Sequence, residues 1–266
     1  MENHSSRPLA VVTGASSGIG LELAKQFATN GFDLLVTAED AELAGAAQAL
    51  EGLGVRVESV QVDLAAEGGV HELWSSIEAL GRPIDAVALN AGVGLGGAFK
   101  DTALEDEMRI IDLNVRSTVH LAKHVVREMV AQGRGRILFT SSIASTMPGS
   151  FQSIYNASKS FVQSFALALR NELKDTGVTV TSLMPGPVGT EFFERADMMD
   201  TKVGTDEKDD PSDVARQGFE ALMDGKERVV SASLSTKITA VASRFLPDSV
   251  KAELHRKMAE PGSAKK

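Results

Sequence analysis

The sequence predicts an α/β protein built on one doubly wound parallel sheet of seven strands, with helices on both faces. Short runs rich in aliphatic residues alternate with longer segments whose apolar residues recur at helical spacing. The short runs are almost continuously apolar, which is typical of parallel strands covered on both faces. Because no repeat or low-complexity linker divides the chain, we expect a single domain over residues 1–266.

The expected strands follow one another along the whole chain. They lie at 9–14, 33–38, 55–63, 86–92, 136–142, 178–186 and 227–232. Helical periodicity fills the intervals, and two long helices are expected at about 104–131 and 153–175. In a Rossmann-like sheet of this kind, ligands bind outside the carboxyl ends of the strands, where the strand order reverses.

Composition excludes several classes of protein. A net charge of −9 and a pI of about 5.1 work against non-specific binding of a phosphate polymer, so we expect no nucleic-acid partner. With no cysteine, the chain has no disulfide, no thiolate nucleophile and no cysteine-based zinc site. The opening residues MENHSSRP are polar, and no run of about 18 apolar residues occurs, which favours a cytoplasmic protein without a membrane span.

Four segments are expected to be less regular. Residues 1–7 and 260–266 are expected to fray. Residues from about 190 to 210 mix aromatic and methionine side chains with charges, which indicates a mobile lid, with packing onto the domain as the alternative. Residues 235–247 are too few to span a bilayer and are expected to form an amphipathic helix that closes the domain or contacts another subunit.

A glycine-rich turn follows the first strand. The stretch TGASSGIG, residues 13–20, leads into a helix, and Gly14, Gly18 and Gly20 permit a tight turn that lets backbone approach a ligand. The helix N-terminus offers free N–H groups and a partial positive charge to a pyrophosphate. The spacing matches neither the Walker A loop nor the commonest dinucleotide fingerprint, and an ordinary strand-to-helix turn is the alternative.

The only tyrosine of the chain stands four residues before a lysine. In a helix, Tyr155 and Lys159 lie on one face, one turn apart. A free tyrosine, with a pKa of about 10, is a poor base near neutrality, but an ammonium about 4 Å away contributes roughly 4 kcal/mol at an effective dielectric near 20. We therefore expect Lys159 to lower the pKa of Tyr155 towards 7 in a partly desolvated cleft. The alternative is a packing tyrosine beside a solvated lysine.

These features occur together with others in a fixed order, and over about residues 8–232 the chain resembles the short-chain dehydrogenase/reductase family, simple single-domain type. The matching motifs are TGASSGIG, Asp63, Asn90-Ala91-Gly92, Asn114, Ser142, Tyr155 with Lys159, and Pro185-Gly186. The resemblance implies an NAD(P)-dependent enzyme that interconverts a secondary alcohol and a ketone or aldehyde by hydride transfer, acting on a small molecule. The alternative is a binding or regulatory protein of the same fold without turnover.

The resemblance also implies roles for individual residues. Tyr155 is the acid/base, Lys159 its activator and a holder of the cofactor ribose, Ser142 the partner of the substrate oxygen, and Asn114 the anchor of a proton-relay water. The implied cofactor-binding residues are Gly14, Ser16, Ser17, Gly18, Ile19, Gly20, Glu39, Asp63, Leu64, Asn90, Ala91, Gly92, Tyr155, Lys159, Pro185, Gly186, Val188 and Thr190. Three alternatives stay open: Ser142 caps a loop, neighbouring backbone satisfies Asn114, and Asp63 forms a strand-end turn.

Glu39, after the second strand, bears on the choice of cofactor. A carboxylate there accepts hydrogen bonds from the ribose hydroxyls but repels a 2′-phosphate by roughly 2 kcal/mol, or about thirtyfold in affinity. Ser17 stands where some NADP enzymes of the family carry a basic residue. We therefore expect NAD(H) to be favoured over NADP(H). The alternative is that Glu39 points into solvent, Asp40 caps a helix, and a basic side chain from elsewhere holds the phosphate.

Two further patterns concern metals and assembly. His120 and His124 are spaced as metal ligands on a helix can be, but the sequence suggests no third ligand, so we expect no metal. The two long helices carry apolar residues over more than one stripe, which predicts a homodimer or homotetramer. The apolar residues are Ile110, Ile111, Val115, Phe161, Phe165 and Leu169.

Overall fold

The computed structural model describes residues 7–231 and 246–265, and its centre is a seven-stranded sheet. The strands are β1 (Leu9–Thr13), β2 (Asp33–Ala38), β3 (Val57–Gln61), β4 (Ala86–Leu89), β5 (Gly135–Thr140), β6 (Val178–Pro185) and β7 (Arg228–Ser231). All neighbours pair in parallel, in the order β3-β2-β1-β4-β5-β6-β7. The predicted doubly wound α/β class is confirmed.

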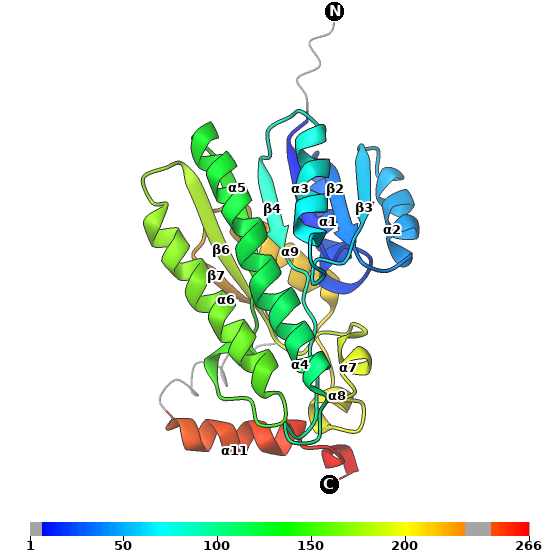
Figure 1. Ribbon diagram of the computed structural model, residues 1–266, viewed down its shortest axis with the longest axis vertical. Coiled ribbons are helices and arrows are strands. Elements are labelled where there is room, and N and C mark those ends of the chain that lie inside the picture. Colours follow the sequence, from blue (N-terminus) through cyan, green and yellow to red (C-terminus); the bar gives the residue numbers. More distant parts are fainter. Residues whose placement is uncertain (1–6, 232–245, 266) are drawn as a thin grey trace, which may run out of the picture.

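Helices cover both faces of the sheet (Figure 1). They are α1 (Gly18–Thr29), α2 (Glu42–Glu51), α3 (Gly69–Ala79), α4 (Leu104–Ile111), the π-helical segment η1 (Asp112–Ser117), α5 (Thr118–Gln132), the 3₁₀ turn η2 (Ile143–Thr146), α6 (Ser153–Glu172), α7 (Phe192–Arg195), α8 (Lys202–Thr205), α9 (Pro211–Met223), α11 (Asp248–Ala259) and the 3₁₀ turn η4 (Ser263–Lys265).

Two apolar cores hold the layers together. One lies between the sheet and α1, α2 and α9, where the Phe27 ring packs edge-on against Phe32 and Phe219 with centroids 5.2 Å apart in each pair. The other lies under α3, α5 and α6, on the near side in Figure 1, where Phe139 meets Phe165 at 5.7 Å. Strands β1 and β2 are buried along their whole length, as their continuous apolar runs predict.

The strand order reverses between β1 and β4. The chain first moves from β1 to β2 and β3, and then crosses to β4 on the other side of β1. The loops that leave β1 and β4 therefore diverge at the carboxyl end of the sheet and open a crevice between them. This crevice is where the sequence places the glycine turn and the segment Asn90–Gly92.

The long helix expected at about 104–131 is interrupted. It runs as α4, then one π-helical segment over Asp112–Ser117, then α5. A π-bulge widens a helix locally, and such bulges are frequent at functional sites. Here the wider turn carries Asn114, which is buried.

The C-terminal elements form a small separate cluster beyond the carboxyl end of the sheet. Phe193, Met198 and Ala259 are among its buried residues, which links the region around α7 and α8 to α11. Within the segment expected to fray, the described residues 260–265 contact the domain, since Ala264 N–H donates to the Asp200 carbonyl at 3.0 Å. The segment expected as an amphipathic helix lies, over 235–245, outside the described residues. Among the helices that the structure describes, none has the length and apolarity needed to cross a membrane.

Candidate active site

The glycine turn is packed tightly against the loop after β4. Gly14 and Gly18 have φ angles of +66° and +55°, which side chains rarely tolerate. A Cβ atom on Gly20 would lie 1.8 Å from the Gly14 carbonyl oxygen, and one on Gly14 would lie 2.9 Å from Ala91 Cα. Only glycine therefore allows these two segments, 70 residues apart, to meet at the start of α1.

Asn90 ties three strand ends together. Its side-chain amide donates to the Thr13 carbonyl of β1 at 3.1 Å and accepts from the Thr140 hydroxyl of β5 at 3.0 Å. The Thr13 hydroxyl in turn accepts from the backbone N–H groups of Asn90 and Ala91, each at 3.0 Å. The carboxyl ends of β1, β4 and β5 are thus held in one fixed arrangement around the crevice.

The crevice is a cavity of about 750 Å³. Every residue predicted to bind the cofactor lines it, from Gly14 in the glycine turn to Thr190 after β6. Of the four predicted catalytic residues, Ser142, Tyr155 and Lys159 line the cavity as well, whereas Asn114 does not. The fold therefore brings together a set of residues that the sequence spreads over more than 170 positions.

An arginine that sequence reasoning missed pairs with two carboxylates that line the cavity near β2 and β3. Arg109, on α4, makes ion pairs with Glu39 and Asp63, the latter at 3.0 Å. Burial alone would raise the pKa of Asp63, but the hydrogen bonds from Arg109 and from the Ala65 N–H lower it overall. No local sequence signal marks Arg109, because its partners belong to other elements of the fold.

Two of the alternatives for the acidic residues can now be compared with the structure. Asp63 accepts from the Ala65 N–H at 2.8 Å, so it forms a strand-end turn and lines the cavity at the same time. Asp40 does not cap α2, whose N-cap is Ala41 without a side-chain cap bond. Instead Asp40 accepts from the Ser16 hydroxyl of the glycine turn at 2.9 Å.

Tyr155 and Lys159 lie on the first two turns of α6, one above the other. The Lys159 Nζ is 5.9 Å from the centre of the Tyr155 ring and donates to the Thr140 carbonyl at 3.0 Å. Burial lowers the pKa of Lys159 to about 8. Burial also raises the pKa of Tyr155 to about 12, although a hydrogen bond with Ser142 acts in the opposite direction. The expected lowering towards 7 is therefore wrong for this structure, because burial of the phenol outweighs its hydrogen bond with Ser142.

Ser142 combines the two roles that the sequence left open. Its hydroxyl oxygen accepts from the Ala144 N–H at 3.1 Å and so caps the 3₁₀ turn η2. The same side chain hydrogen-bonds Tyr155 at the wall of the cavity. The neighbouring Ser141 hydroxyl donates to the Lys159 carbonyl at 3.0 Å, which fixes α6 to the end of β5.

Asn114 does not line the cavity but contacts the residues around it. Its side-chain oxygen accepts from Val93 N–H at 2.9 Å, and its NH₂ group donates to the Val93 carbonyl at 2.9 Å and to the Ser158 hydroxyl at 3.0 Å. Neighbouring groups thus satisfy the amide, which was one of the two expectations. A Cβ atom on Gly92 would lie 3.1 Å from both Asn114 Oδ1 and Lys159 Nζ, so Asn114 positions the loop on which Lys159 rests. The anchoring of a relay water stays a prediction.

The far end of the cavity is lined by aromatic and methionine side chains together with polar ones, and it includes a helix that the sequence did not assign to it. The Phe192 ring lies 5.1 Å from that of Tyr155. His255 and Met258 of α11 also line the cavity, and His255 Nδ1 lies 2.9 Å from the Ser150 carbonyl. Because α11 follows Ser150 by about 100 residues, only the folded chain shows that it closes this end of the site.

The residues present fit a nicotinamide dinucleotide. The glycine turn at the N-terminus of α1 suits a pyrophosphate. Acidic groups suited to ribose hydroxyls line one end of the cavity, and among the described residues the buried Asp40 Oδ1 has no hydrogen-bond partner. At the other end a phenol, an ammonium and a hydroxyl lie together. Fold and site define a dinucleotide-dependent oxidoreductase.

Comparisons with known proteins identify the family. The family model for short chain dehydrogenases matches residues 8–200. The chain is 35% identical to the NADP-dependent 3-hydroxy acid dehydrogenase YdfG of Salmonella typhi over 187 residues, 69% of this chain and 74% of that protein. A solved short-chain dehydrogenase from Sphingobium yanoikuyae in complex with NADPH is 29% identical and superimposes with a TM-score of 0.77, over 89% of this chain and 92% of that one.

This protein belongs to the short-chain dehydrogenase/reductase family, as its motifs indicate. It is an NAD(P)-dependent oxidoreductase that interconverts an alcohol and a carbonyl compound. The resemblance stated from the sequence is confirmed.

Proposed function

We propose that this protein reduces the carbonyl group of an apolar small molecule with NADH, and that Tyr155 is the general acid. The observation that carries the proposal is the Tyr155 phenol at the cavity wall, hydrogen-bonded to Ser142 and one helical turn from Lys159. Desolvation raises its pKa, so it stays protonated at neutral pH. A protonated phenol can donate to the carbonyl oxygen as negative charge develops there. The reduced nicotinamide, when bound, supplies the hydride.

The neighbours of Tyr155 support this step. The Ser142 hydroxyl orients the substrate oxygen beside the phenol by a hydrogen bond. Lys159 stabilises the phenolate left after proton transfer, and it does so more strongly in this buried position than in water. The structure describes one acceptor for the three Nζ donors of Lys159, the Thr140 carbonyl, which leaves donors for the hydroxyls of the cofactor ribose.

The lining of the far end supports an apolar substrate. Phe192, Phe193, Met147 and Met258 line the cavity there. Methionine and phenylalanine side chains adapt to apolar groups of different shape, and they offer few polar contacts for a sugar or a small hydroxy acid. The substrate class proposed is a ketone with at least one bulky apolar substituent.

Glu39 supports NAD(H) over NADP(H). Its carboxylate lines the cavity and would accept hydrogen bonds from the adenosine ribose. Two arginines lie near this end. Arg109 pairs with Glu39 and Asp63, and Arg195, which lines the cavity, pairs with Asp40. A 2′-phosphate would have to compete with these carboxylates for either arginine. The cited relatives do not favour NAD(H), since YdfG is named as NADP-dependent and the Sphingobium structure holds NADPH. The NAD(H) proposal therefore rests on Glu39 alone.

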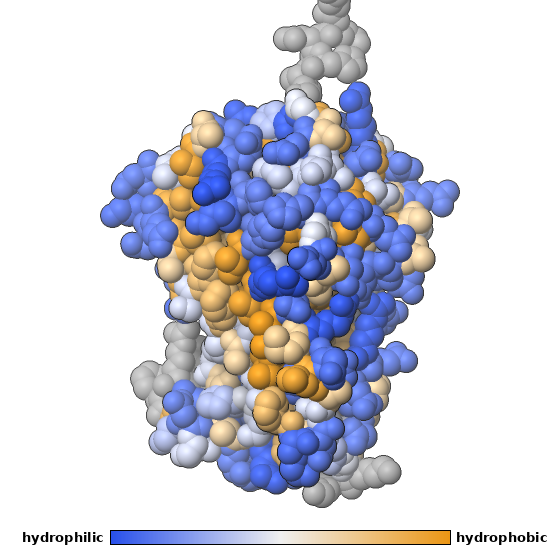
Figure 2. All heavy atoms as spheres, viewed as in Figure 1, coloured by the Kyte–Doolittle hydropathy of each residue, from blue (hydrophilic) through white to orange (hydrophobic). Residues whose placement is uncertain are grey.

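Exposed apolar side chains on α4, α5 and α6 support a homodimer or homotetramer. Leu104, Met108, Val130 and Phe161 are each more than a third exposed, and Figure 2 shows a hydrophobic band over these helices. Ile110, predicted to belong to this surface, is buried in the core instead. Light scattering is expected to give a multiple of 28.1 kDa at micromolar concentration, and a monomer would contradict the proposal.

The substitution Tyr155→Phe tests the catalytic proposal, because it removes only the proton-bearing oxygen. We expect kcat for ketone reduction to fall by about 10²- to 10⁴-fold, while NADH binding and the circular dichroism spectrum stay unchanged. Rates are followed by the loss of NADH absorbance over a panel of apolar ketones. Activity within about threefold of the wild type would remove Tyr155 from the mechanism.

A further inference from the structure

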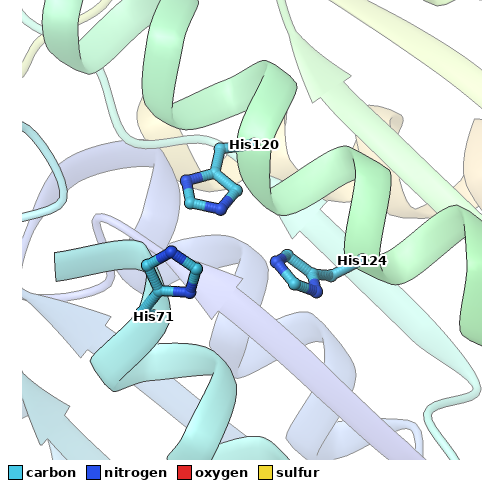
Figure 3. Close-up of side chains that lie close together, drawn as sticks. All are labelled: His71, His120 and His124. Atoms are coloured by element: carbon cyan, nitrogen blue, oxygen red, sulfur yellow. The ribbon is translucent and has the colours of Figure 1, made fainter. Parts of the chain in front are cut away.

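Three histidines gather on the side of the molecule where α3 packs beside α5, and none of them lines the cofactor cavity. His71 lies in the first turn of α3, and His120 and His124 lie in the first two turns of α5. Figure 3 shows the three rings turned towards one shared space between the two helices. His71 is exposed, and the other two are partly buried.

The spacing of the ring nitrogens is close to that of a metal site. One nitrogen from each histidine lies within 4.8 Å of the others. A tetrahedral ion with Zn–N bonds of about 2.0–2.1 Å holds its ligand nitrogens about 3.4 Å apart. The separations between the nitrogens have to shorten by at most roughly 1.4 Å, and the broad χ2 torsion of histidine allows such a movement.

The chemical state of the rings also suits a metal ion. Among the described residues, no hydrogen bond engages a ring nitrogen of these three histidines, so their lone pairs are uncommitted. An imidazole nitrogen with a free lone pair is the group that binds such metals.

We infer that His71, His120 and His124 bind one divalent transition-metal ion, Zn²⁺ in first place, with the fourth position taken by water. Three imidazole nitrogens suit Zn²⁺, Cu²⁺ and Ni²⁺, whereas Mg²⁺ and Ca²⁺ require oxygen ligands. The ion joins α3 to α5 and takes no part in hydride transfer. The sequence analysis expected no metal because it found only two ligands, and the fold supplies the third.

The only tryptophan of the chain provides a spectroscopic test. The Trp74 ring stacks on His124 with centroids 4.8 Å apart and planes at 26°. In the full-length, untagged, metal-stripped protein, NiCl₂ is expected to quench this fluorescence with one ion per chain, and ZnCl₂ is expected to restore it by displacing the nickel. Calorimetry with ZnCl₂ is expected to give the same stoichiometry. Absence of both signals at micromolar metal would overturn the inference.

Variants assign the ligands. His71→Gln and His120→Gln leave the tryptophan and its stacking partner in place, and each should weaken Zn²⁺ binding at least about a hundredfold, since loss of mere outer-shell partners costs 10–100-fold. His4→Gln is the matched control for loss of a histidine and should bind as the wild type does. Zn²⁺ should raise the melting temperature of the wild type and of this control only. Unchanged Zn²⁺ affinity in His71→Gln, with NADH binding showing that the variant is folded, would assign the cluster to ring packing alone.

Discussion

The two ends of the active-site cavity differ in whether backbone or side-chain atoms surround the glycines that line them. At the dinucleotide end, Gly14 and Gly20 have backbone atoms as their closest neighbours, and a Cβ atom on Gly20 would meet the Gly14 carbonyl at 1.8 Å. At the substrate end, the neighbours are the tips of side chains, as where a Cβ atom on Gly94 would meet Phe192 Cζ at 2.4 Å. Backbone held in a sheet cannot move aside, whereas a phenylalanine ring can. The dinucleotide end is therefore rigid and holds the cofactor in one position, whereas the substrate end can adapt to its substrate.

The hydrogen bonds show the same contrast. Asn90 connects β1, β4 and β5 at the dinucleotide end, all within the central sheet. At the substrate end, α11 is attached through His255 to the Ser150 carbonyl and through the small cluster around Phe193. Fewer contacts to the sheet leave that end easier to displace.

Gly20→Ala should have the largest effect and test the rigid end. The new methyl group meets the Gly14 carbonyl and the Asn90 amide, so either the turn opens or α1 shifts. A cost of about 3 kcal/mol would weaken NADH binding roughly a hundredfold, measured by fluorescence titration. Binding within about threefold of the wild type would show that this end adapts too.

Lys159→Met tests the residue shared by both ends, and its effect depends on pH. The folded-state pKa of Lys159 is lowered from 10.5 to about 8, so the charged form costs the folded state about 3 kcal/mol at pH 7. The lost hydrogen bond to Thr140 offsets about 1 kcal/mol of this, so the free energy of unfolding of the variant should exceed that of the wild type by about 2 kcal/mol. The variant should nevertheless bind NADH weakly and turn over poorly.

The sign of the pH dependence is fixed by the lowered pKa. Below pH 8, Lys159 is protonated in both the folded and the unfolded wild type. The difference in free energy of unfolding between the variant and the wild type then has its full value of about 2 kcal/mol. Between about pH 8 and 10.5 the folded wild type releases the proton and the unfolded chain keeps it. The free energy of unfolding of the wild type therefore rises relative to that of the variant. Urea unfolding at pH 7 and pH 10 measures both values, and a gap that is constant with pH would contradict the assignment.

Glu39→Arg probes charge rather than shape at the rigid end. The variant replaces a carboxylate by a cation and frees Arg109 from one of its two partners. The ratio of kcat/KM for NADH to that for NADPH should fall by about thirtyfold or more. Glu51→Gln, at the exposed end of α2, serves as a control for surface charge. A wild-type preference for NADPH would defeat the NAD(H) proposal outright.

Gly94→Ala should have the smallest effect and test the adaptable end. The Phe192 ring has to move by a small rotation, which costs about 1 kcal/mol. We expect KM for bulky ketones to rise about fivefold, with KM for NADH unchanged. A loss of NADH binding would show that the two ends are coupled.

Much of the rigid end was predictable because its determinants are local in sequence. Each of three features can be recognised within a window of about ten residues: the glycine turn, the apolar strands and the spacing of Tyr155 and Lys159. In the structure, all the residues predicted to bind the cofactor line one cavity. What the sequence misjudged was the pKa of Tyr155, because burial depends on everything packed around the phenol.

By itself, the sequence determined the class of fold, the order of the elements and the residues that meet at the carboxyl end of the sheet, since periodicity and glycine placement constrain backbone directly. The tertiary structure alone decided that Arg109 engages Glu39, that α11 covers the substrate end, and that His71 joins His120 and His124. Each of these pairs residues on different elements, and their distances depend on how whole helices pack, which no local pattern encodes.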